Sequence, residues 1–502
     1  MTTPNGDQEN ARDIADDIRT LEKMGYHQEL LRRLSGFSNY AISMSIICIL
    51  AGGVTSFHIG YCAIGGAAIG LGWPLVCLFS LAVALTMGQV ASAFPTSGGL
   101  YHWASILGGK GWGWGTAWFN IAGLATVLAA IDVGFYQFVL GAWHLIDPEN
   151  APKPAEWIQH LTVAGIMFCQ GVINHRGVRL TTRLTDFSGW WILGVALILT
   201  VSLLFSVTTW DFGRLIRFTN YSGLPVGDNP VWPASGNIPW LFFLALLLPA
   251  YTMTGFDASA HAAEETIGAA RHVPQGIVRS VVVSGIFGWL MLSAVVLAMP
   301  DMDLAAAAGD TVFVSTLIAT LPPWLVLILV GSIALAQFLC GLATVTASSR
   351  MLYAFARDGG LPCSHLIRRV GRHGTPGAAI FVICLSALAF TWHNETYTLI
   401  TLVSALFLSI SYMVPTMLGL IHYRKVTWGP WHLGIWFRPL AVFAMLASVI
   451  LIILGMIPPN EEAAYLTGGF LLILAGVWHG WESKRFQGPP NIQGLRQKPA
   501  SP

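Results

Sequence analysis

Apolar runs of about 20 residues recur along almost the whole chain, and this feature most restricts the folds that it can adopt. They extend from about residue 37 to residue 482, with only short polar gaps between them. A helix of about 20 apolar residues crosses the hydrocarbon core of a bilayer. Only 10% of the residues are charged, whereas soluble domains contain roughly 25%. The sequence therefore predicts an all-α integral membrane protein with one membrane domain.

Twelve segments have the length and apolarity of a membrane-spanning helix. The ninth is short, and the stretch 304–321 is either an external helix or part of the eighth span. We expect the spans near residues 36–62, 70–94, 116–146, 156–175, 186–208, 238–262, 279–299, 322–349, 377–392, 397–422, 437–457 and 463–482.

Basic residues are distributed unevenly between the two sides of this arrangement. Of the 26 Lys and Arg residues, only Lys153, Arg214 and Arg217 fall in loops on the side opposite the N-terminus. Cytoplasmic loops of membrane proteins carry such an excess of Lys and Arg. The N-terminal segment has no signal-peptide pattern. We therefore expect both termini in the cytoplasm and a multi-pass protein of a plasma or bacterial inner membrane.

Spans one and six both carry residues that interrupt a helix. Span one contains Gly52 and Gly53, and span six contains Pro249 and Gly255. Irregular backbone at bilayer depth is tolerated where it lines a cavity or a site. The two spans lie five apart, so their topology is inverted, which is typical of a substrate site in a secondary transporter. Close packing between helices is the alternative explanation for the glycine pair.

The two interruptions predict complementary halves of one binding site. A carboxylate would bind backbone N–H groups in the gap after Gly52 and Gly53. An amino group would bind carbonyl groups of residues 248–252, before the gap in span six. The aromatic residues nearby would line the pocket or pack against lipid and core. The candidate substrate-binding residues are Gly52, Gly53, Val54, Thr55, Ser56, Tyr251, Thr252, Thr254, Gly255 and Phe256.

Two acidic residues lie inside predicted spans, where charged side chains are rare and usually functional. Asp132 is in the middle of span three, and Asp257 follows the interruption of span six. A lone carboxylate in a low dielectric favours its protonated form, so each is a candidate for proton coupling or for pairing with a cationic group. Alternatively, Asp132 makes a structural hydrogen bond and Asp257 caps the restarted helix.

Patterns typical of enzymes and metal sites are missing from the sequence. Residues 108–111 lack the spacing of a phosphate-binding loop, and His261 with Glu264 lacks the second His of a zinc helix. The seven cysteines occur singly and are expected to be buried small hydrophobic residues. The sequence has no basic patch interleaved with aromatic residues, so nucleic acid is not a candidate partner. We expect no enzyme activity, no cofactor and no bound metal, and a lipid bilayer as the surroundings.

Four stretches carry a family resemblance. They are the glycine-containing segment of span one, a Pro-Thr-Ser-Gly-Gly turn, the Gly-Phe-Asp segment of span six and a Ser-Arg-Met-Leu-Tyr segment, at residues 45–53, 91–101, 255–277 and 349–359. Together they resemble the amino acid–polyamine–organocation transporters, within them the amino acid/choline branch that includes GABA permeases. The resemblance covers about residues 20 to 480.

The resemblance implies two inverted five-helix repeats, over residues 36–208 and 238–422. It also implies two extra helices over 437–482, with cytoplasmic tails at 1–34 and 483–502 around the domain 35–482. Alternating access by a rocking bundle is the implied mechanism.

The resemblance also implies roles for individual residues. The α-carboxylate of a substrate would lie near Gly52, Gly53 and Val54, and its amine near the carbonyl groups of span six. Tyr251 matches an aromatic gate and Asp257 an acidic gating residue. The Pro-Thr-Ser-Gly-Gly turn matches a cytoplasmic loop beside the permeation path.

The coupling ion and the substrate stay open at this stage. Span five has no Lys or Arg, although some proton-coupled relatives carry a Lys there. The middle of span eight lacks the paired hydroxyls of a sodium site, and Thr344, Thr346 and Ser348 are weaker candidates. A proton gradient or exchange is expected, and sodium less so. GABA, neutral or basic α-amino acids, choline, ethanolamine and polyamines remain open, as do the oligomeric state and a non-transporting nutrient sensor.

Overall fold

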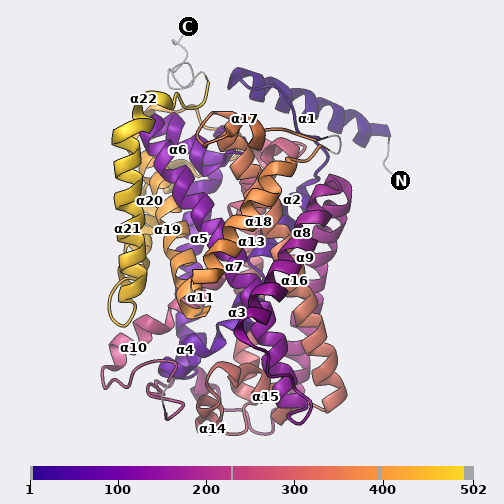
Figure 1. The fold of residues 1–502 in the computed structure, drawn as a ribbon, viewed down its shortest axis with the longest axis vertical. Helices are drawn as coiled ribbons and strands as arrows, with labels where there is room; N and C mark the ends of the chain where they lie inside the picture. The colour runs from indigo at the N-terminus through magenta and orange to yellow at the C-terminus, as the bar shows by residue number, and fades with distance from the viewer. Residues whose placement is uncertain (1–3, 228–229, 372–373, 394–396, 491–502) are drawn as a thin grey trace.

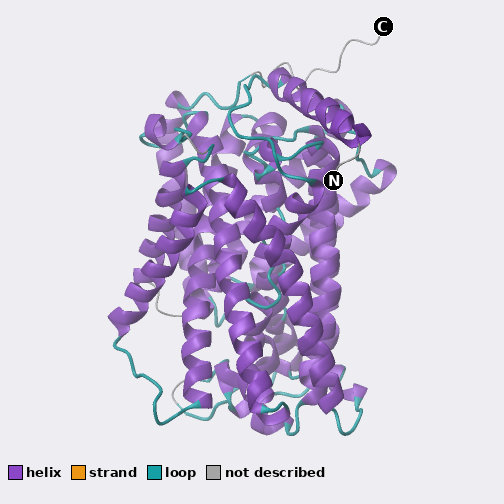
Figure 2. Ribbon diagram, turned by 90° about the vertical axis from the view of Figure 1, so that its right-hand side faces the viewer, coloured by secondary structure: helices purple, strands orange, loops and turns teal. Residues whose placement is uncertain are grey.

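The computed structural model of the chain describes residues 4–227, 230–371, 374–393 and 397–490. Within these ranges every regular element is helical, and the single β-type contact is a bridge between Leu34 and Thr266. The expected all-α class is therefore confirmed. Figures 1 and 2 show the helices packed roughly side by side in one elongated bundle.

Eight of the described helices are long and apolar enough to cross a membrane. They are η1 with α5 (Ala68–Ala93), α7 (Lys110–Ile146), α9 (Val178–Ser206), α13 (Ala269–Ala298), α16 (Pro323–Arg357), α19 (Tyr397–Ile421), η6 with α20 (Gly434–Leu454), and α21 with η7 and α22 (Glu461–Arg485). Two further helices, α8 (Glu156–His175) and α18 (Gly377–His393), lie at positions of predicted spans.

Several helices begin earlier or end later than their apolar runs. Thus α13 begins at Ala269 and α16 continues to Arg357, where the sequence predicted limits near residues 279 and 349. The helical backbone continues through polar turns outside the hydrocarbon core, so hydropathy alone does not mark these ends.

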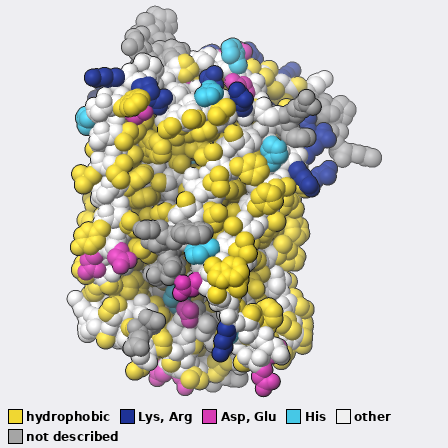
Figure 3. Space-filling view, viewed as in Figure 1, with side chains coloured by type: hydrophobic (Ala, Val, Ile, Leu, Met, Phe, Trp, Pro, Cys, Tyr) yellow, Lys and Arg dark blue, Asp and Glu magenta, His cyan; other side chains and the backbone are white. Residues whose placement is uncertain are grey.

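Large apolar side chains are exposed on the sides of the bundle. Phe205 is 87% exposed and Leu472 75% exposed, which is expected where lipid rather than water surrounds a helix. On the face in Figure 3, hydrophobic side chains cover the flanks, and most Lys and Arg side chains lie toward the end that carries both termini. The chain is therefore a multi-pass membrane protein.

The first predicted span consists of three helices with a break between the first two. They are α2 (Gly36–Ile46), α3 (Gly52–Thr55) and α4 (Phe57–Ile64). The non-helical segment therefore lies before Gly52 and Gly53, and the expectation of a gap after them was wrong. The two glycines instead form the start of α3.

The sixth predicted span is also discontinuous. Its parts are α10 (Ile238–Ala245), α11 (Leu247–Thr252), α12 (Ala258–His261) and the short turn η3 (Ala263–Glu265). The expected break at Gly255 is present, and this residue has a φ of 88°, which glycine adopts without strain. Pro249 is not in that break but lies inside α11. Proline has no N–H to donate to the carbonyl four residues earlier, which here belongs to Ala245. The helix is therefore interrupted at Leu246, between α10 and α11.

The ambiguous stretch 304–321 is separate from the eighth span. It forms α14 (Met302–Ala307), η4 (Gly309–Thr311) and α15 (Val312–Thr320), and Leu321 and Pro322 separate these from α16. In Figure 1, α14 and α15 lie at the end of the bundle opposite the termini. The external-helix alternative is therefore the one that the structure adopts.

Two of the seven cysteines differ from the expectation of burial. Cys48, Cys62, Cys340 and Cys384 are buried and Cys77 is half-buried, but Cys169 and Cys363 are exposed. Cys169 lies on an outer face of α8, and Cys363 lies in a loop, which the apolar context of the sequence did not reveal.

The N-terminal helix α1 (Pro4–Lys23) lies across one end of the bundle (Figures 1 and 2). Asp17 of this helix accepts hydrogen bonds from the N–H groups of Gly268 and Ala269, at the start of α13. Its carboxylate also lies 3.4 Å from the guanidinium of Arg32. The tail is therefore attached to the bundle by buried polar contacts.

Candidate functional site

The interruptions of the first and sixth spans lie against each other. A side chain at Gly52 would place its Cβ atom 3.0 Å from both the Cα and the Oγ1 of Thr252, the last residue of α11. Only a glycine permits this approach without movement of the backbone. The structure therefore brings together the two segments that the sequence predicted to form one site.

Both interruptions leave backbone polar groups without partners among the described residues. The N–H groups of Gly53 and Val54 make no hydrogen bond, and the carbonyl groups of Ala250 and Thr252 accept none. Buried backbone groups are almost always paired. Free donors next to free acceptors suit a ligand that carries both a carboxylate and an ammonium group.

A cavity of about 310 Å³ reaches one of these segments. Val54 and Thr55 line its inner end, together with Tyr397 at the start of α19. Its other walls include His58, Gln137 and Asp310, which lies in the turn η4. The cavity therefore extends from the break of the first span toward the end of the bundle opposite both termini.

Tyr397 joins the two interruptions through its hydroxyl group. This hydroxyl lies 2.5 Å from the Thr55 hydroxyl and 3.1 Å from that of Ser56, and it also interacts with the Tyr251 hydroxyl. Thr55 in turn donates to the carbonyl of Ala51, in the non-helical segment. Of the predicted residues, Thr55, Ser56 and Tyr251 thus meet at one hydroxyl cluster beside the cavity.

Other predicted binding residues lie away from this cavity. Thr254 and Phe256 line a small separate hollow with Tyr412 of α19. Gly53 faces α5 and α13, where an added Cβ would lie 3.7 Å from Leu292 and Trp73, an ordinary contact distance. Gly52, rather than Gly53, therefore makes the close approach between the two breaks.

Asp257 is completely buried and belongs to a hydrogen-bond network that joins three helices. Its Oδ1 accepts from the Tyr412 hydroxyl at 2.7 Å, and its Oδ2 accepts from the Asn120 amide of α7 at 3.0 Å. His261 Nε2 lies 3.1 Å from the same Oδ2 atom. Asp257 occupies the N-cap position of α12, but its side chain makes no capping hydrogen bond. The capping alternative is therefore wrong.

Asp132 lies elsewhere, between α7, α8 and α16. Its Oδ1 accepts from the Gln170 amide at 2.8 Å, close to the backbone of Gly341. Its Oδ2 atom has no partner among the described residues, and neither has Oε1 of Gln170. The expected alternative of a structural bond to a neighbouring helix is present. Asp132 is not among the residues that line the cavity.

The weaker sodium-site candidates already have partners in the protein. The hydroxyls of Thr344 and Ser348 donate to carbonyl groups of their own helix, α16, and Thr346 donates to Asn174. These bonds use the hydroxyl hydrogens, whereas a sodium ion would bind the oxygen lone pairs.

Two buried ion pairs lie at the end of the bundle that carries the termini. Arg357 binds both carboxylate oxygens of Glu264 at 2.9 Å, and Glu264 also accepts the N–H of Ser97 at 3.0 Å. Arg350 binds Glu265 at 2.7 Å. Arg357 and Arg350 belong to α16, whereas both glutamates belong to η3, just after the broken sixth span. These pairs hold η3 against α16.

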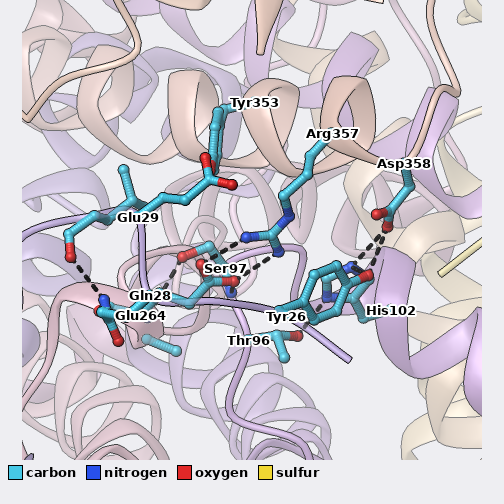
Figure 4. A network of polar contacts seen from close by, with 12 residues as sticks. Tyr26, Gln28, Glu29, Thr96, Ser97, His102, Glu264, Tyr353, Arg357 and Asp358 are labelled. Atoms are coloured by element: carbon cyan, nitrogen blue, oxygen red, sulfur yellow. Dashed lines mark hydrogen bonds and ion pairs between the residues drawn. The ribbon is translucent and has the colours of Figure 1, made fainter. Parts of the chain in front are cut away.

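The N-terminal segment completes this arrangement (Figure 4). The Tyr26 hydroxyl donates to Asp358 at 2.7 Å, and it lies 2.8 Å from Nε2 of His102 in α6 (Leu100–Gly108). Tyr101 donates to the same Asp358 oxygen at 2.8 Å. Burial, and then the charge of Asp358, raise the pKa of Tyr26, so its phenol stays a proton donor. We call Tyr26, Ser97, His102, Glu264, Arg357 and Asp358 the terminal-side network.

Sequence reasoning missed Tyr397, Tyr412, Asn120 and His261. Each is polar and lies inside a predicted span or at its end, which was the available signal. Tyr397 and Tyr412 are separated by more than 140 residues from the groups that they bind, and spacing along the chain does not reveal such pairs.

Buried polar groups around two facing breaks in membrane helices define a permease-like membrane protein. The chain belongs to the amino acid permease family, whose model matches residues 34–478. It is 31% identical to the amino-acid permease BAT1 of Arabidopsis thaliana over 460 residues, which cover 87% of this chain and 88% of that protein. It is 29% identical to a BAT1 homolog of Oryza sativa subsp. japonica, over 94% of this chain and 96% of that protein. It is 28% identical to the GABA-specific permease of Saccharomyces cerevisiae, over 96% of this chain and 87% of that protein. The family resemblance seen in the motifs is thereby confirmed.

Proposed function

We propose that the protein is a secondary active transporter that moves an amino acid or a related amine by alternating access. The observation that carries this proposal is the contact between the two breaks, with free N–H groups at Gly53 and Val54 and free carbonyl groups at Ala250 and Thr252. A zwitterion placed there would satisfy both sets of groups at once. The cavity beside Val54 and Thr55 supplies a route to this position.

The conformation supports a role for the terminal-side network as a closed cytoplasmic gate. The cavity extends toward the end opposite the termini, while ion pairs and Tyr26 hold the other end closed. Transport then requires that Arg357 separates from Glu264 so that the substrate reaches the cytoplasm. Such a buried pair is reversible, because water replaces the lost partners when the gate opens.

The proposed topology has twelve spans in two inverted five-helix repeats and two further helices, with both termini in the cytoplasm. The excess of Lys and Arg near the end that carries the termini supports this orientation in a plasma or bacterial inner membrane (Figure 3). The domain limits proposed from the sequence, 1–34, 35–482 and 483–502, follow from the same scheme.

The proposed substrate is GABA or another amino acid, because the family and the named relatives are amino acid and GABA permeases. A permease for choline, ethanolamine or polyamines is the alternative within the same fold. The proposed driving force is a proton gradient or exchange, with Asp257 as the first candidate for coupling and Asp132 as the second. Sodium is disfavoured because the middle of the eighth span, residues 337–341, lacks the paired hydroxyls of a sodium site.

Purified protein in liposomes tests this proposal. Uptake of radiolabelled GABA, neutral and basic amino acids, putrescine and choline would be measured twice, once with a more acidic solution outside the liposomes and once with equal pH on both sides. Uptake of at least one compound, competed by its analogues, is expected. A compound that raises the melting temperature but is never taken up would instead favour a non-transporting nutrient sensor.

A further inference from the structure

The contacts of His261 require a proton that a neutral imidazole cannot supply. Its Nδ1 atom lies 3.2 Å from the carbonyl oxygen of Ser97, and its Nε2 atom lies 3.1 Å from Oδ2 of Asp257. A carbonyl oxygen only accepts hydrogen bonds, so Nδ1 must carry a hydrogen. In a neutral ring, Nε2 would then present a lone pair to Asp257.

A lone pair facing an ionised carboxylate would be repulsive, and both side chains are completely buried. The contact between Nε2 of His261 and Oδ2 of Asp257 is therefore a hydrogen bond only if one further proton lies between these two atoms. That proton is either on Nε2, as imidazolium with carboxylate, or on Oδ2, as imidazole with carboxylic acid. Both forms carry the same total number of protons.

The other partners of Asp257 agree with this count. The Tyr412 hydroxyl accepts the N–H of Gly255, so its own hydrogen is free for Oδ1 of Asp257. Asn120 donates its amide hydrogen to Oδ2. Neither partner needs a proton from the pair.

Within the described hydrogen bonds and ion pairs, Tyr412 is the single titratable side chain outside the pair that binds Asp257 or His261. Helix α12 packs against α2, α13 and α16. Of the titratable groups on those helices, Tyr40, Arg271, His272, Arg279, Cys340 and Tyr353 make no described bond to His261 or Asp257. The nearest charged groups along the chain, Glu264 and Glu265, are paired with Arg357 and Arg350.

We propose that Asp257 and His261 together hold one dissociable proton, and that His261 is the second half of the proton-coupling site. This inference rests on the proposed transport function and deepens it, because it assigns a proton site to a pair of residues rather than to one carboxylate. The proton is taken up from the outside and released to the cytoplasm, with no other reactant.

Ser97 links this proton to the terminal-side network. His261 binds the carbonyl oxygen of Ser97, and Glu264 binds its N–H group. Gly99, with a φ of 47°, lies directly against the imidazole, where an added Cβ would be 3.2 Å from Nδ1. Loss of the proton makes the Asp257 contact repulsive, which displaces His261 and loosens the loop around Ser97. Proton release and opening toward the cytoplasm are thus coupled by one residue.

Nuclear magnetic resonance of the protein in lipid bilayers tests the shared proton without any substrate. Histidine nitrogen-15 and aspartate carbon-13 signals would be assigned with His261→Gln and Asp257→Asn and followed against pH. We expect the two residues to change in one step with a common midpoint. A neutral ring protonated only at Nδ1 beside an ionised Asp257, or separate midpoints, would overturn the proposal.

Transport of radiolabelled GABA in liposomes tests the coupling. We expect His261→Gln to lose at least tenfold in accumulation driven by an acid exterior while it keeps GABA exchange across the membrane. His144→Gln, on the outer part of α7, is the matched control and should keep both. Acid-driven accumulation by His261→Gln at the wild-type level would refute the coupling role. If the wild type does not move GABA, the substrate proposal fails, and the resonance experiment still decides the shared proton.

Discussion

Removal of the positive partner of Glu264 should open the terminal-side network. In Arg357→Gln, Glu264 keeps its bond to the Ser97 N–H but loses two charge-assisted bonds of 2.9 Å in a completely buried position. Breaking a buried ion pair from one side costs about 3–5 kcal/mol. Because one donor remains, we take the lower end, about 3 kcal/mol, which is a factor of about 100 in an equilibrium.

This cost applies only to the conformation in which Glu264 is buried. Water can hydrate the carboxylate once η3 moves away from α16, so the equilibrium shifts toward an open cytoplasmic side. The shift is measurable at Ser97→Cys, which is completely buried beneath the pair. The exposed Cys169 and Cys363 would first be replaced by serine.

The assay is the rate of maleimide labelling of Ser97→Cys from the cytoplasmic side. We expect Arg357→Gln to raise this rate by about 100-fold, in line with the population shift. Arg19→Gln is the matched control, because the Arg19–Asp16 pair is 68% exposed and contributes at most about 1 kcal/mol. An unchanged rate in Arg357→Gln, or an equal rise in Arg19→Gln, would show that the ion pair does not close the gate.

Three further predictions concern the proposed site. Asp257→Asn should abolish uptake, or uncouple it from the proton gradient, while the protein still reaches the membrane. If the variant takes up substrate with the same kinetics as the wild type, independent of pH, Asp257 is not part of the coupling mechanism. Gly52→Val should lower substrate affinity at least tenfold, since its Cβ would lie 3.0 Å from the backbone of Thr252. Gly53→Ala should keep the wild-type affinity, because the nearest neighbours of its Cβ would lie at 3.7 Å. Equal affinities of the two variants in thermal-shift titrations would contradict this difference. Replacement of sodium by potassium should leave uptake in liposomes unchanged, and lost uptake would overturn the preference for protons.

The linear pattern of the sequence was sufficient for several conclusions. Runs of about 20 apolar residues predicted a helical membrane protein, and the motifs predicted the family. The break at Gly255 was also predictable, because a glycine at bilayer depth is a local signal. These features depend on residues that are neighbours along the chain.

The partners of the site depend on tertiary structure. Asp257 was visible in the sequence as a charge in an apolar run, but its bonds to Asn120 and Tyr412 cross 137 and 155 residues. The attachment of Tyr26 to Asp358 spans 332 residues. Hydropathy and helical periodicity hold no information on which distant helices meet.

The contrast is clearest at the two glycines and at His261. Sequence alone treated Gly52 and Gly53 as equivalent, and the packing of α3 against Thr252 distinguishes them. His261 was only a residue that fitted no zinc motif. The number of protons that it shares with Asp257 could be inferred only from the fold, which places a carbonyl group at one ring nitrogen and a carboxylate at the other. Residue types determine which groups can bind, whereas the distances between helices decide which of them do.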